Sequence, residues 1–262
     1  MEIRLGGFRA DPKDKIYKPY HSGLFSGAAP ISVGDIDLRP FSSPRHNQRT
    51  TNSCVAQSLV KALEIKRIQA HGREAHVDLS IMHLYYGARE LMNPREVDKD
   101  AGTHISLACD MLRTNGVCRE MTWPTTSDNL YIPPSVMAYR ECYLNKIQAN
   151  YRINSTGWER VDDVIDNLRM GNPVVFGTLV GSNWFNYQGK KPLEPTPWDK
   201  AKGSHAICLV GWVDGKFIIE NSWGESWGME GFAELEPEVI ADSNSQDFWV
   251  IVSGSEVWAE KK

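Results

Sequence analysis

The sequence predicts an α+β fold in which helices come first along the chain and β-strands follow. Three amphipathic stretches in the first half carry apolar residues at helical spacing. Short runs rich in β-branched and aromatic residues fill much of the second half instead. A proline-rich connection with Pro124, Pro133 and Pro134 separates the two halves. A chain of 262 residues can bury a substantial core, either as one large domain or as two packed lobes.

Three helices are expected in the first half, over residues 54–70, 79–92 and 105–114. The first carries Val55, Leu59 and Leu63 on one stripe, and Asn52 or Ser53 before it is a natural N-cap. The second is expected to end at the Asn-Pro pair that follows it, and the third at an Asn-Gly pair.

The second half is expected to hold one helix and then a series of strands. The helix covers about residues 159–170 and is ended by Gly171. The strands are expected over residues 174–176, 206–212, 217–220, 231–235 and 248–252. Asp214-Gly215 lies between the second and third strands and predicts a tight hairpin turn there.

The chain therefore divides into three parts. Residues 1–35 contain glycine, proline and charge with little periodicity, which predicts an irregular N-terminal segment. Residues 36–148 are expected to form a helical lobe, and residues 149–262 a β-rich lobe that packs against it as one unit.

Composition and charge exclude several classes of function. The net charge of −4 provides no basic field, so neither nucleic acid nor an acidic membrane surface is an expected partner. The longest apolar runs, such as residues 173–180, are strand-length and too short to span a membrane. No apolar signal-peptide region stands near the start, so the default expectation is a cytoplasmic protein, unless a dedicated export route delivers it.

The five cysteines indicate thiols rather than disulfides. An odd count without an export signal argues against a disulfide framework. No Cys-x-x-Cys pair occurs and the histidines are scattered, so no metal site is expected. Cys109, Cys118, Cys142 and Cys208 are expected to be buried as small hydrophobic side chains.

Cys54 lies in the first turn of a predicted helix, where the helix dipole and unpaired N–H groups favour a thiolate. Gln48 stands six residues earlier in a polar turn. Its side-chain amide and the Cys54 backbone N–H could together stabilise an oxyanion. A cysteine at a helix start is more often structural than catalytic, so this signal needs partners elsewhere in the chain.

The partners lie in the second half. His205 stands at the start of a predicted strand, and Asn221 follows the end of the next strand sixteen residues later. The predicted hairpin brings the start of one strand beside the end of the other. The Asn221 amide oxygen can then accept a hydrogen bond from the imidazole of His205 and fix its tautomer and orientation. Trp223 is suited to shield that bond from water.

Three segments together resemble the active-site blocks of papain-like (C1 family) cysteine peptidases. They are Gln48-Arg49-Thr50-Thr51-Asn52-Ser53-Cys54, Gly203-Ser204-His205-Ala206 and Asn221-Ser222-Trp223-Gly224-x-x-Trp227-Gly228. The resemblance covers about residues 36–252, and the Asn-Ser-Trp-Gly block is its most specific part. His205 lies 151 residues after Cys54, a spacing typical of the family.

This resemblance implies a papain-like two-lobe fold, with the active site in the cleft between a helical lobe and a β-barrel-like lobe. It implies Cys54 as nucleophile, His205 as general base and acid, Asn221 as orienting group and Gln48 as oxyanion donor. The implied reaction is endopeptidase cleavage of protein or peptide substrates through a thioester acyl-enzyme, without metal or organic cofactor. The implied substrate-binding residues are Gly102, Thr103, Gly177, Ser204, Ala206 and Trp223. Asp247 would then admit a basic side chain to the main pocket.

The sequence departs from the family pattern in places. Asn52 stands where the family usually has glycine, and we expect it to tolerate the left-handed backbone that such a turn requires. Thr51 replaces a cysteine, so the usual disulfide is absent. The long helical propeptide is missing, and residues 79–90 resemble bacterial-type members.

Two questions stay open at the level of sequence. Residues 1–35 form either a strap that holds the two lobes together, which the sequence slightly favours, or an autoinhibitory leader along the groove, with the small residues 22–29 threading it. The protein is also either an active peptidase or a catalytically silent papain-like protein that binds peptides or partners. A transpeptidase, deamidase or exopeptidase on the same scaffold is a third reading.

Overall fold

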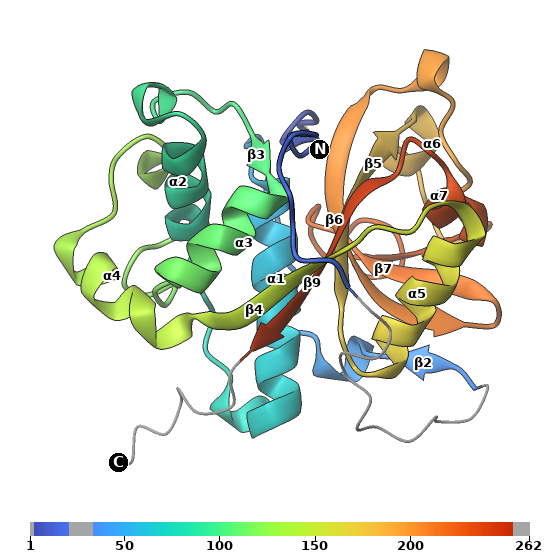
Figure 1. The fold of residues 1–262 in the computed structure, drawn as a ribbon, viewed down its shortest axis with the longest axis horizontal. Coiled ribbons are helices and arrows are strands. Elements are labelled where there is room, and N and C mark those ends of the chain that lie inside the picture. The colour runs from blue at the N-terminus through green and yellow to red at the C-terminus, as the bar shows by residue number, and fades with distance from the viewer. Residues whose placement is uncertain (1–2, 21–33, 254–262) are drawn as a thin grey trace.

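A computed structural model describes residues 3–20 and 34–253 of the protein. Figure 1 shows two parts, one mainly helical and one built on a β-sheet, with the N-terminal segment running between them. The small residues 22–29, which we considered as a segment that threads the groove, lie outside the described residues.

The helices of the described chain differ greatly in length. They are α1 (Cys54–His71), α2 (Ile81–Met92), α3 (Ile105–Thr114), α4 (Val136–Glu141), α5 (Gly157–Arg169), α6 (Ser182–Phe185) and α7 (Pro237–Ala241). Short 3-10 turns cover Arg39–Phe41, Arg73–Ala75, Pro94–Glu96, Asp128–Leu130, Cys142–Asn145 and Trp198–Lys200. The helices α1 to α4 form the helical part, whereas α5 and α7 pack on the side of the sheet (Figure 1).

The main sheet is antiparallel throughout. Its strands follow the order β4 (Ile147–Ile153), β9 (Gln246–Ser253), β5 (Val174–Val180), β6 (Gly203–Val213), β7 (Lys216–Glu220) and β8 (Phe232–Leu235), and β2 (Ile36–Asp37) pairs with β6. Among the described residues β4 and β8 do not pair with each other, so the sheet is open rather than closed like a barrel. A second, two-stranded parallel sheet joins β1 (Phe8–Arg9) to β3 (Thr103–His104).

These elements confirm the predicted α+β class. The predicted long helices and all five predicted strands are present; four strands are longer than expected, and β8 is one residue shorter. The sequence analysis missed β4 and α4. The residues of β4 mix polar and apolar side chains without a clear alternation, and α4 is too short to show a helical period.

Helix α1 lies at the centre of the molecule. It packs against β6, α2 and α3, and almost all of its residues up to Ile68 are buried, including Lys61 and Glu64. One hydrophobic core cluster extends from α1 into the main sheet, so the two parts share a core. This position brings the N-terminus of α1 to the boundary between the two parts. None of the helices in the described chain has the length and apolarity to cross a membrane.

Candidate active site

The turn before α1 places Cys54 at the first position of the helix. Ser53 is the N-cap residue, although its side chain makes no capping bond. The Asp100 carboxylate accepts the Asn52 N–H, and the Asp100 carbonyl accepts the Asn52 side-chain amide at 2.7 Å. Asn52 does not have a positive φ, so our expectation of a left-handed residue at this position was wrong. The buried Asp100 carboxylate holds the turn instead.

His205 and Asn221 are brought together by the predicted hairpin. Asp214 and Gly215 form its turn with φ of 49° and 74°, and β6 and β7 pair on either side. The imidazole Nε2 of His205 lies 2.8 Å from Asn221 Oδ1, which also accepts the Ser222 N–H at 2.8 Å. Because the backbone N–H fixes Oδ1 as an acceptor, Nε2 must be the protonated nitrogen. His205 Nδ1 has no hydrogen-bond partner among the described residues and keeps its lone pair.

Trp223 covers this pair as the sequence suggested. Its ring centroid lies 5.0 Å from that of His205, with 32° between the planes, and both side chains are buried. Phe185 stacks on the same tryptophan and Trp227 meets it edge-on. The aromatic cluster excludes water from the His205–Asn221 hydrogen bond, which strengthens the bond.

Gln48 is held by three hydrogen bonds at the same boundary. Its Nε2 donates to the Thr51 carbonyl at 2.9 Å and to the Arg4 carbonyl at 3.0 Å. Its Oε1 accepts the Ser222 hydroxyl at 2.7 Å. This bond orients the amide so that Nε2 is on the donor side. One amide hydrogen of Gln48 therefore faces the N-terminal segment.

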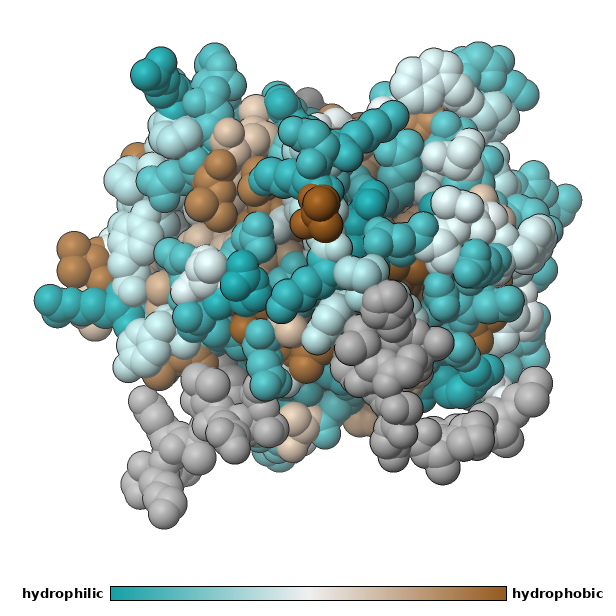
Figure 2. Space-filling view, in the orientation of Figure 1, coloured by the Kyte–Doolittle hydropathy of each residue, from teal (hydrophilic) through white to brown (hydrophobic). Residues whose placement is uncertain are grey.

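The N-terminal segment covers Cys54. A Cβ atom added at Gly7 would lie 2.8 Å from Cys54 Sγ and would collide with the Asn52 carbonyl, so the Gly7 backbone lies directly against the sulfur. Thr103 N–H donates to Gly7 O at 3.0 Å, and Gly6 N–H donates to Ser204 O at 2.9 Å. Figure 1 shows the segment in dark blue between the helices and the sheet. In Figure 2 the surface along this crossing is mainly hydrophilic.

Phe8 fills the position where a side-chain pocket was expected. Its ring lies so close to the Gly177 Cα that any side chain at residue 177 would collide with it. Ala206 is the register partner of Gly177 in the main sheet. The Phe8 carbonyl accepts the Ser204 hydroxyl at 2.8 Å, and a Cβ at Gly102 would collide with the Gly7 carbonyl. The implied substrate-binding residues that contact the N-terminal segment are Gly102, Thr103, Gly177 and Ser204.

Burial keeps both reactive groups neutral in this state. Cys54 and His205 are fully buried, and burial raises the pKa of the Cys54 thiol to about 12. A hydrogen bond between the thiol and the Ala206 backbone acts against this shift. The residue that follows His205 therefore lies beside the Cys54 sulfur. Burial also lowers the pKa of His205 to about 4, opposed by the hydrogen bond to Asn221. The covered site therefore holds a thiol and a neutral imidazole rather than an ion pair.

Asp247 is not free to receive a basic side chain. Its Oδ1 lies 2.6 Å from the Arg152 guanidinium, and its Oδ2 accepts the Asp11 N–H at 2.6 Å. The carboxylate is buried, and its charge is compensated by Arg152. These contacts do not support the expectation that Asp247 selects basic side chains.

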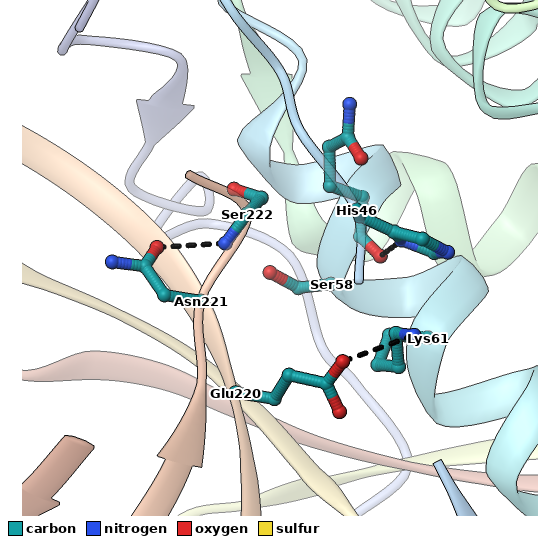
Figure 3. Close-up of a pocket in the computed structure, with 7 residues that line it drawn as sticks. His46, Ser58, Lys61, Glu220, Asn221 and Ser222 are labelled. Carbon is teal, nitrogen blue, oxygen red and sulfur yellow. Dashed lines mark hydrogen bonds and ion pairs between the residues drawn. The ribbon is translucent and has the colours of Figure 1, made fainter. Parts of the chain in front are cut away.

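A buried ion pair lies behind Asn221 and joins the two parts of the molecule. Lys61 on α1 lies 3.0 Å from Glu220, the last residue of β7, and both are nearly fully buried. Arg45 contacts the same carboxylate at 3.1 Å. Lys61 and Glu220 border a water-sized cavity of about 10 Å³ that Ser58 and Ser222 also line (Figure 3). The sequence analysis did not identify this pair, because neither residue belongs to a recognisable motif.

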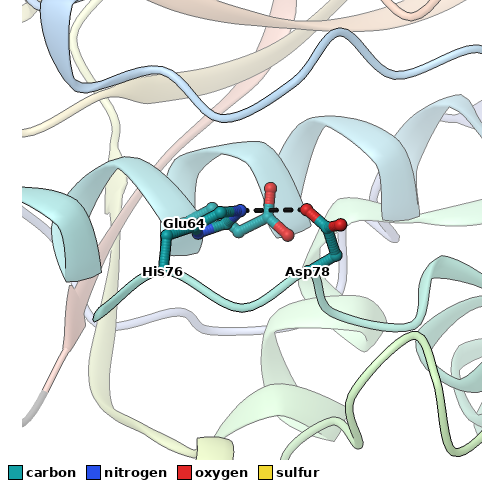
Figure 4. A group of neighbouring side chains, drawn as sticks. All are labelled: Glu64, His76 and Asp78. Carbon is teal, nitrogen blue, oxygen red and sulfur yellow. Dashed lines mark hydrogen bonds and ion pairs between the residues drawn. The ribbon is translucent and has the colours of Figure 1, made fainter. Parts of the chain in front are cut away.

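A second cluster contains side-chain types that bind metals. Glu64, His76 and Asp78 bring their ligand atoms within 4.8 Å of one another (Figure 4). Glu64 already accepts the Leu79 N–H at 2.9 Å and the Ser43 hydroxyl at 2.6 Å, and His46 lies 3.1 Å from it. These bonds give the buried Glu64 carboxylate a structural role, because they link α1 to the loop that precedes α2.

The chain is similar to known cysteine proteases. The family model described as papain family cysteine protease matches residues 35–250. An uncharacterised peptidase C1-like protein of Acanthamoeba polyphaga mimivirus is 30% identical over 236 residues, which cover 84% of this chain and 75% of that protein. Bovine pro-cathepsin H is 26% identical over 209 residues, covering 75% of this chain and 56% of that protein.

Solved structures show the same fold. Xylellain, a cysteine protease from Xylella fastidiosa, has a TM-score of 0.79 and 25% identity, with 97% of this chain and 99% of that chain covered. Procathepsin L2 from the larval midgut of Tenebrio molitor has a TM-score of 0.76 at 19% identity, covering 95% and 78% of the two chains. The chain belongs to the papain family of cysteine proteases and is a cysteine-type peptidase.

Proposed function

We propose that the protein is an endopeptidase that cleaves peptide bonds with Cys54, His205 and Asn221. The observation that carries the proposal is the His205–Asn221 hydrogen bond, whose polarity is fixed by the Ser222 N–H. It leaves the unprotonated Nδ1 of His205 available to take a proton from a thiol. The sulfur of Cys54 lies beside the residue that follows His205, at the start of α1.

The proposed cycle uses side chains and one backbone N–H of this chain, together with a water molecule. The Cys54 sulfur adds to the scissile carbonyl carbon while its proton passes to His205 Nδ1, and the oxyanion is held by Gln48 Nε2 and the Cys54 backbone N–H. His205 then gives the proton to the leaving amine, and the C–N bond breaks to leave a thioester. Water, deprotonated by His205, attacks the thioester, and the thiol is regained with release of a carboxylic acid.

We also propose that the N-terminal segment inhibits this site rather than acting only as a strap. The Gly7 backbone lies on the sulfur and Phe8 fills the groove beside Gly177. The segment is not positioned as a substrate, because the Gly7 carbonyl is bound by Thr103 N–H, whereas Gln48 Nε2 holds the carbonyl of Arg4. The Gly7 carbonyl is thus held by Thr103 and not by the proposed oxyanion donor.

A substitution at Gly7 tests both proposals in the full chain. Gly7→Val places a side chain against Cys54 Sγ and the Asn52 carbonyl, which displaces the segment. We expect an epoxide-type thiol inhibitor to label Cys54 much faster than in the parent, and a peptide substrate to be hydrolysed. Ala10→Val, at an exposed position of the same segment, should behave like the parent. Cys54→Ala in the Gly7→Val background should abolish both signals.

The same variant separates the competing functions. A silent, peptide-binding protein would bind peptides after Gly7→Val but hydrolyse none of them. An endopeptidase should cut a peptide library at internal bonds, whereas an exopeptidase would release only terminal residues. A folded Gly7→Val protein that neither labels nor hydrolyses would contradict the proposed function.

A further inference from the structure

Asp100 lies between the helical part of the molecule and the active site. Its side chain is only 4% exposed, and its carboxylate accepts the Asn52 N–H at 3.0 Å and the Tyr85 hydroxyl at 2.7 Å. The Tyr85 hydroxyl in turn accepts the Gly102 N–H at 2.9 Å. The carboxylate is therefore held in place by the turn that carries Cys54 and by helix α2.

A third partner of this carboxylate comes from the N-terminal segment. Arg4 Nη1 lies 3.1 Å from Asp100 Oδ2 and donates to the Thr50 carbonyl at 3.3 Å. Within the described part of the chain, this is the ion pair that Asp100 makes. Displacing residues 4–9 therefore leaves the Asp100 carboxylate without its cation. A carboxylate held at a partly desolvated position attracts a cation more strongly than one in bulk water.

The Arg4 backbone indicates which part of a substrate would face Asp100. The Arg4 carbonyl accepts a hydrogen bond from Gln48 Nε2 at 3.0 Å, and this amide is the group that we propose as oxyanion donor. In a bound substrate the same amide would hold the carbonyl oxygen of the scissile bond. The residue that supplies this carbonyl would then have a long side chain within reach of the position that the Arg4 guanidinium occupies.

The position of Asp100 also sets it apart from Asp247, which the sequence suggested as the acceptor of a basic side chain. Asp247 is paired with Arg152 of β4, and it keeps this partner when the N-terminal segment is displaced. Asp100 lies near the nucleophile, because its charge adds to the effect of burial, the main cause of the raised pKa of the Cys54 thiol. Asp100 is therefore the carboxylate that a basic substrate side chain would meet beside the sulfur.

We infer that Asp100 is a specificity-determining residue that selects substrates with an arginine immediately before the scissile bond. The inference rests on the proposed endopeptidase function and on the role of Gln48 in it. The substrate guanidinium takes the position of the Arg4 guanidinium, with the Asp100 carboxylate and the Thr50 carbonyl as its acceptors. The planar guanidinium can donate to both acceptors at once, and the compact ammonium group of lysine fits them less well. Lysine therefore ranks second.

Two peptide substrates that differ only in this residue test the inference in the full-length Gly7→Val protein. One has arginine before the scissile bond, and the other has citrulline, which has nearly the same shape without the charge. We expect kcat/KM to be at least about 10-fold higher for arginine, because hydrogen bonds to charged groups are the stronger kind. Most of the difference should lie in KM, since the ion pair forms in the bound substrate as well as in the transition state. Added salt should reduce the preference, because the Arg4 side chain is 51% exposed at this position.

Three variants in the same background identify the charge that selects the substrate. Asp100→Asn should lower the preference to about threefold or less, and the ratio of the two substrates cancels any general loss of activity from a disturbed turn. Asp98→Asn removes a charge from an exposed position of the same loop and should keep the preference. Tyr85→Phe should keep it as well, because it removes a hydrogen bond to the Asp100 carboxylate but not its charge.

The outcomes separate this inference from the proposed function. If the Gly7→Val protein hydrolyses the citrulline peptide as fast as the arginine peptide, the inference is wrong while the endopeptidase function stands. An arginine preference that survives Asp100→Asn would also overturn the inference, because the selecting charge would then lie elsewhere. If the Gly7→Val protein hydrolyses neither peptide, the inference and the proposed function fail together.

Discussion

The reactivity of Cys54 depends on what covers it. The first turn of α1 favours a thiolate, but burial under Gly7 raises the pKa of the thiol to about 12. His205 responds in the opposite direction, since burial disfavours the imidazolium. Displacing residues 4–9 should let water reach both groups and relax the two pKa shifts together. With Gly7 in place, burial thus favours a neutral thiol and imidazole over a Cys–His ion pair.

Gln48 offers a test of the proposed oxyanion site. In the Gly7→Val background, Gln48→Ala should lower kcat by about 100-fold or more with little change in KM, because the lost bond forms only in the transition state. Steady-state kinetics on a peptide substrate measures both constants. Ser222→Ala is the comparison variant, since it removes the hydroxyl that orients the Gln48 amide but keeps the Nε2 donor, and its loss in kcat should be smaller. A Gln48→Ala rate near that of its parent would exclude Gln48 from the oxyanion site.

His83 should make stability depend on pH. Its ring is fully buried, neither nitrogen has a hydrogen-bond partner among the described residues, and burial lowers its pKa to about 4. Between pH 6.5 and 4 the unfolded chain binds a proton that the folded chain does not bind. The free energy of unfolding should therefore fall as pH falls through this window, by on the order of 3 kcal/mol for this group.

Urea unfolding of the Cys54→Ala protein from pH 7 to pH 4 measures this effect without self-digestion. His83→Leu in the same background should show a shallower decline, because the group that titrates only in the unfolded state is gone. His205 titrates with the same sign in both proteins, so the difference between the two curves reports His83. Parallel curves would contradict the prediction.

The sequence identified the residues that share a local motif. Cys54, His205 and Asn221 each stand in a recognisable block, and the hairpin at Asp214 explained how two of them meet. The contact between Gly7 and Cys54 joins positions 47 residues apart and carries no periodic signal. Such contacts depend on tertiary packing, which hydrophobic patterning does not specify.

At the scale of elements, α1 is a central helix rather than an amphipathic surface helix. Its polar residues are buried together with its apolar ones. The apolar stripe in the sequence therefore predicted only one of its buried faces. The Lys61–Glu220 pair shows the consequence, because it links the helix that carries Cys54 to the strand that precedes Asn221 (Figure 3). Residue spacing predicted the helix and the strand, but not the link between them.

Removing one partner of the Lys61–Glu220 pair should lower the stability of the protein strongly. Removing both charges should lower it much less. Lys61→Met leaves the buried Glu220 carboxylate with Arg45 as its ion-pair partner and the Ser42 hydroxyl as a donor, and we expect a loss of about 3–5 kcal/mol in the free energy of unfolding. Lys61→Met/Glu220→Met removes both buried charges. The double variant should be more stable than the sum of the single losses predicts, by about 0.5–3 kcal/mol. Chemical denaturation of the four proteins measures this coupling, and strictly additive losses would contradict it.

For the whole molecule, the N-terminal segment joins the two lobes and closes the groove at once. Asp11 shows how the two roles coincide. Its Oδ1 accepts the Ser106 N–H at the start of α3 and its Oδ2 accepts the Trp249 indole N–H of β9. The sequence analysis treated strap and inhibitor as alternatives. Within this one segment the strap contacts lie at Asp11 and residues 17–20, and the groove-filling contacts lie at residues 4–9.

Asp11 should make the closure of the site by the N-terminal segment depend on pH. Burial, and then the nearby Asp247 carboxylate, raise the pKa of Asp11 in the closed state. The released segment has the ordinary carboxyl pKa, so the closed state binds a proton that the released state does not bind in mildly acidic solution. Acidification should therefore stabilise the closed state, and the stabilisation is lost as pH rises through the closed-state pKa.

Comparing the parent with Asp11→Ala tests this dependence, because alanine removes the titrating group and both hydrogen bonds. At neutral pH, Asp11→Ala should label at Cys54 faster than the parent, though more slowly than Gly7→Val, which displaces the backbone that lies on the sulfur. The ratio of the Asp11→Ala rate to the parent rate should grow as pH falls from 7 towards 4. Taking the ratio cancels the intrinsic pH dependence of the thiol. A ratio that stays constant or shrinks on acidification would show that the Asp11 carboxyl does not control closure.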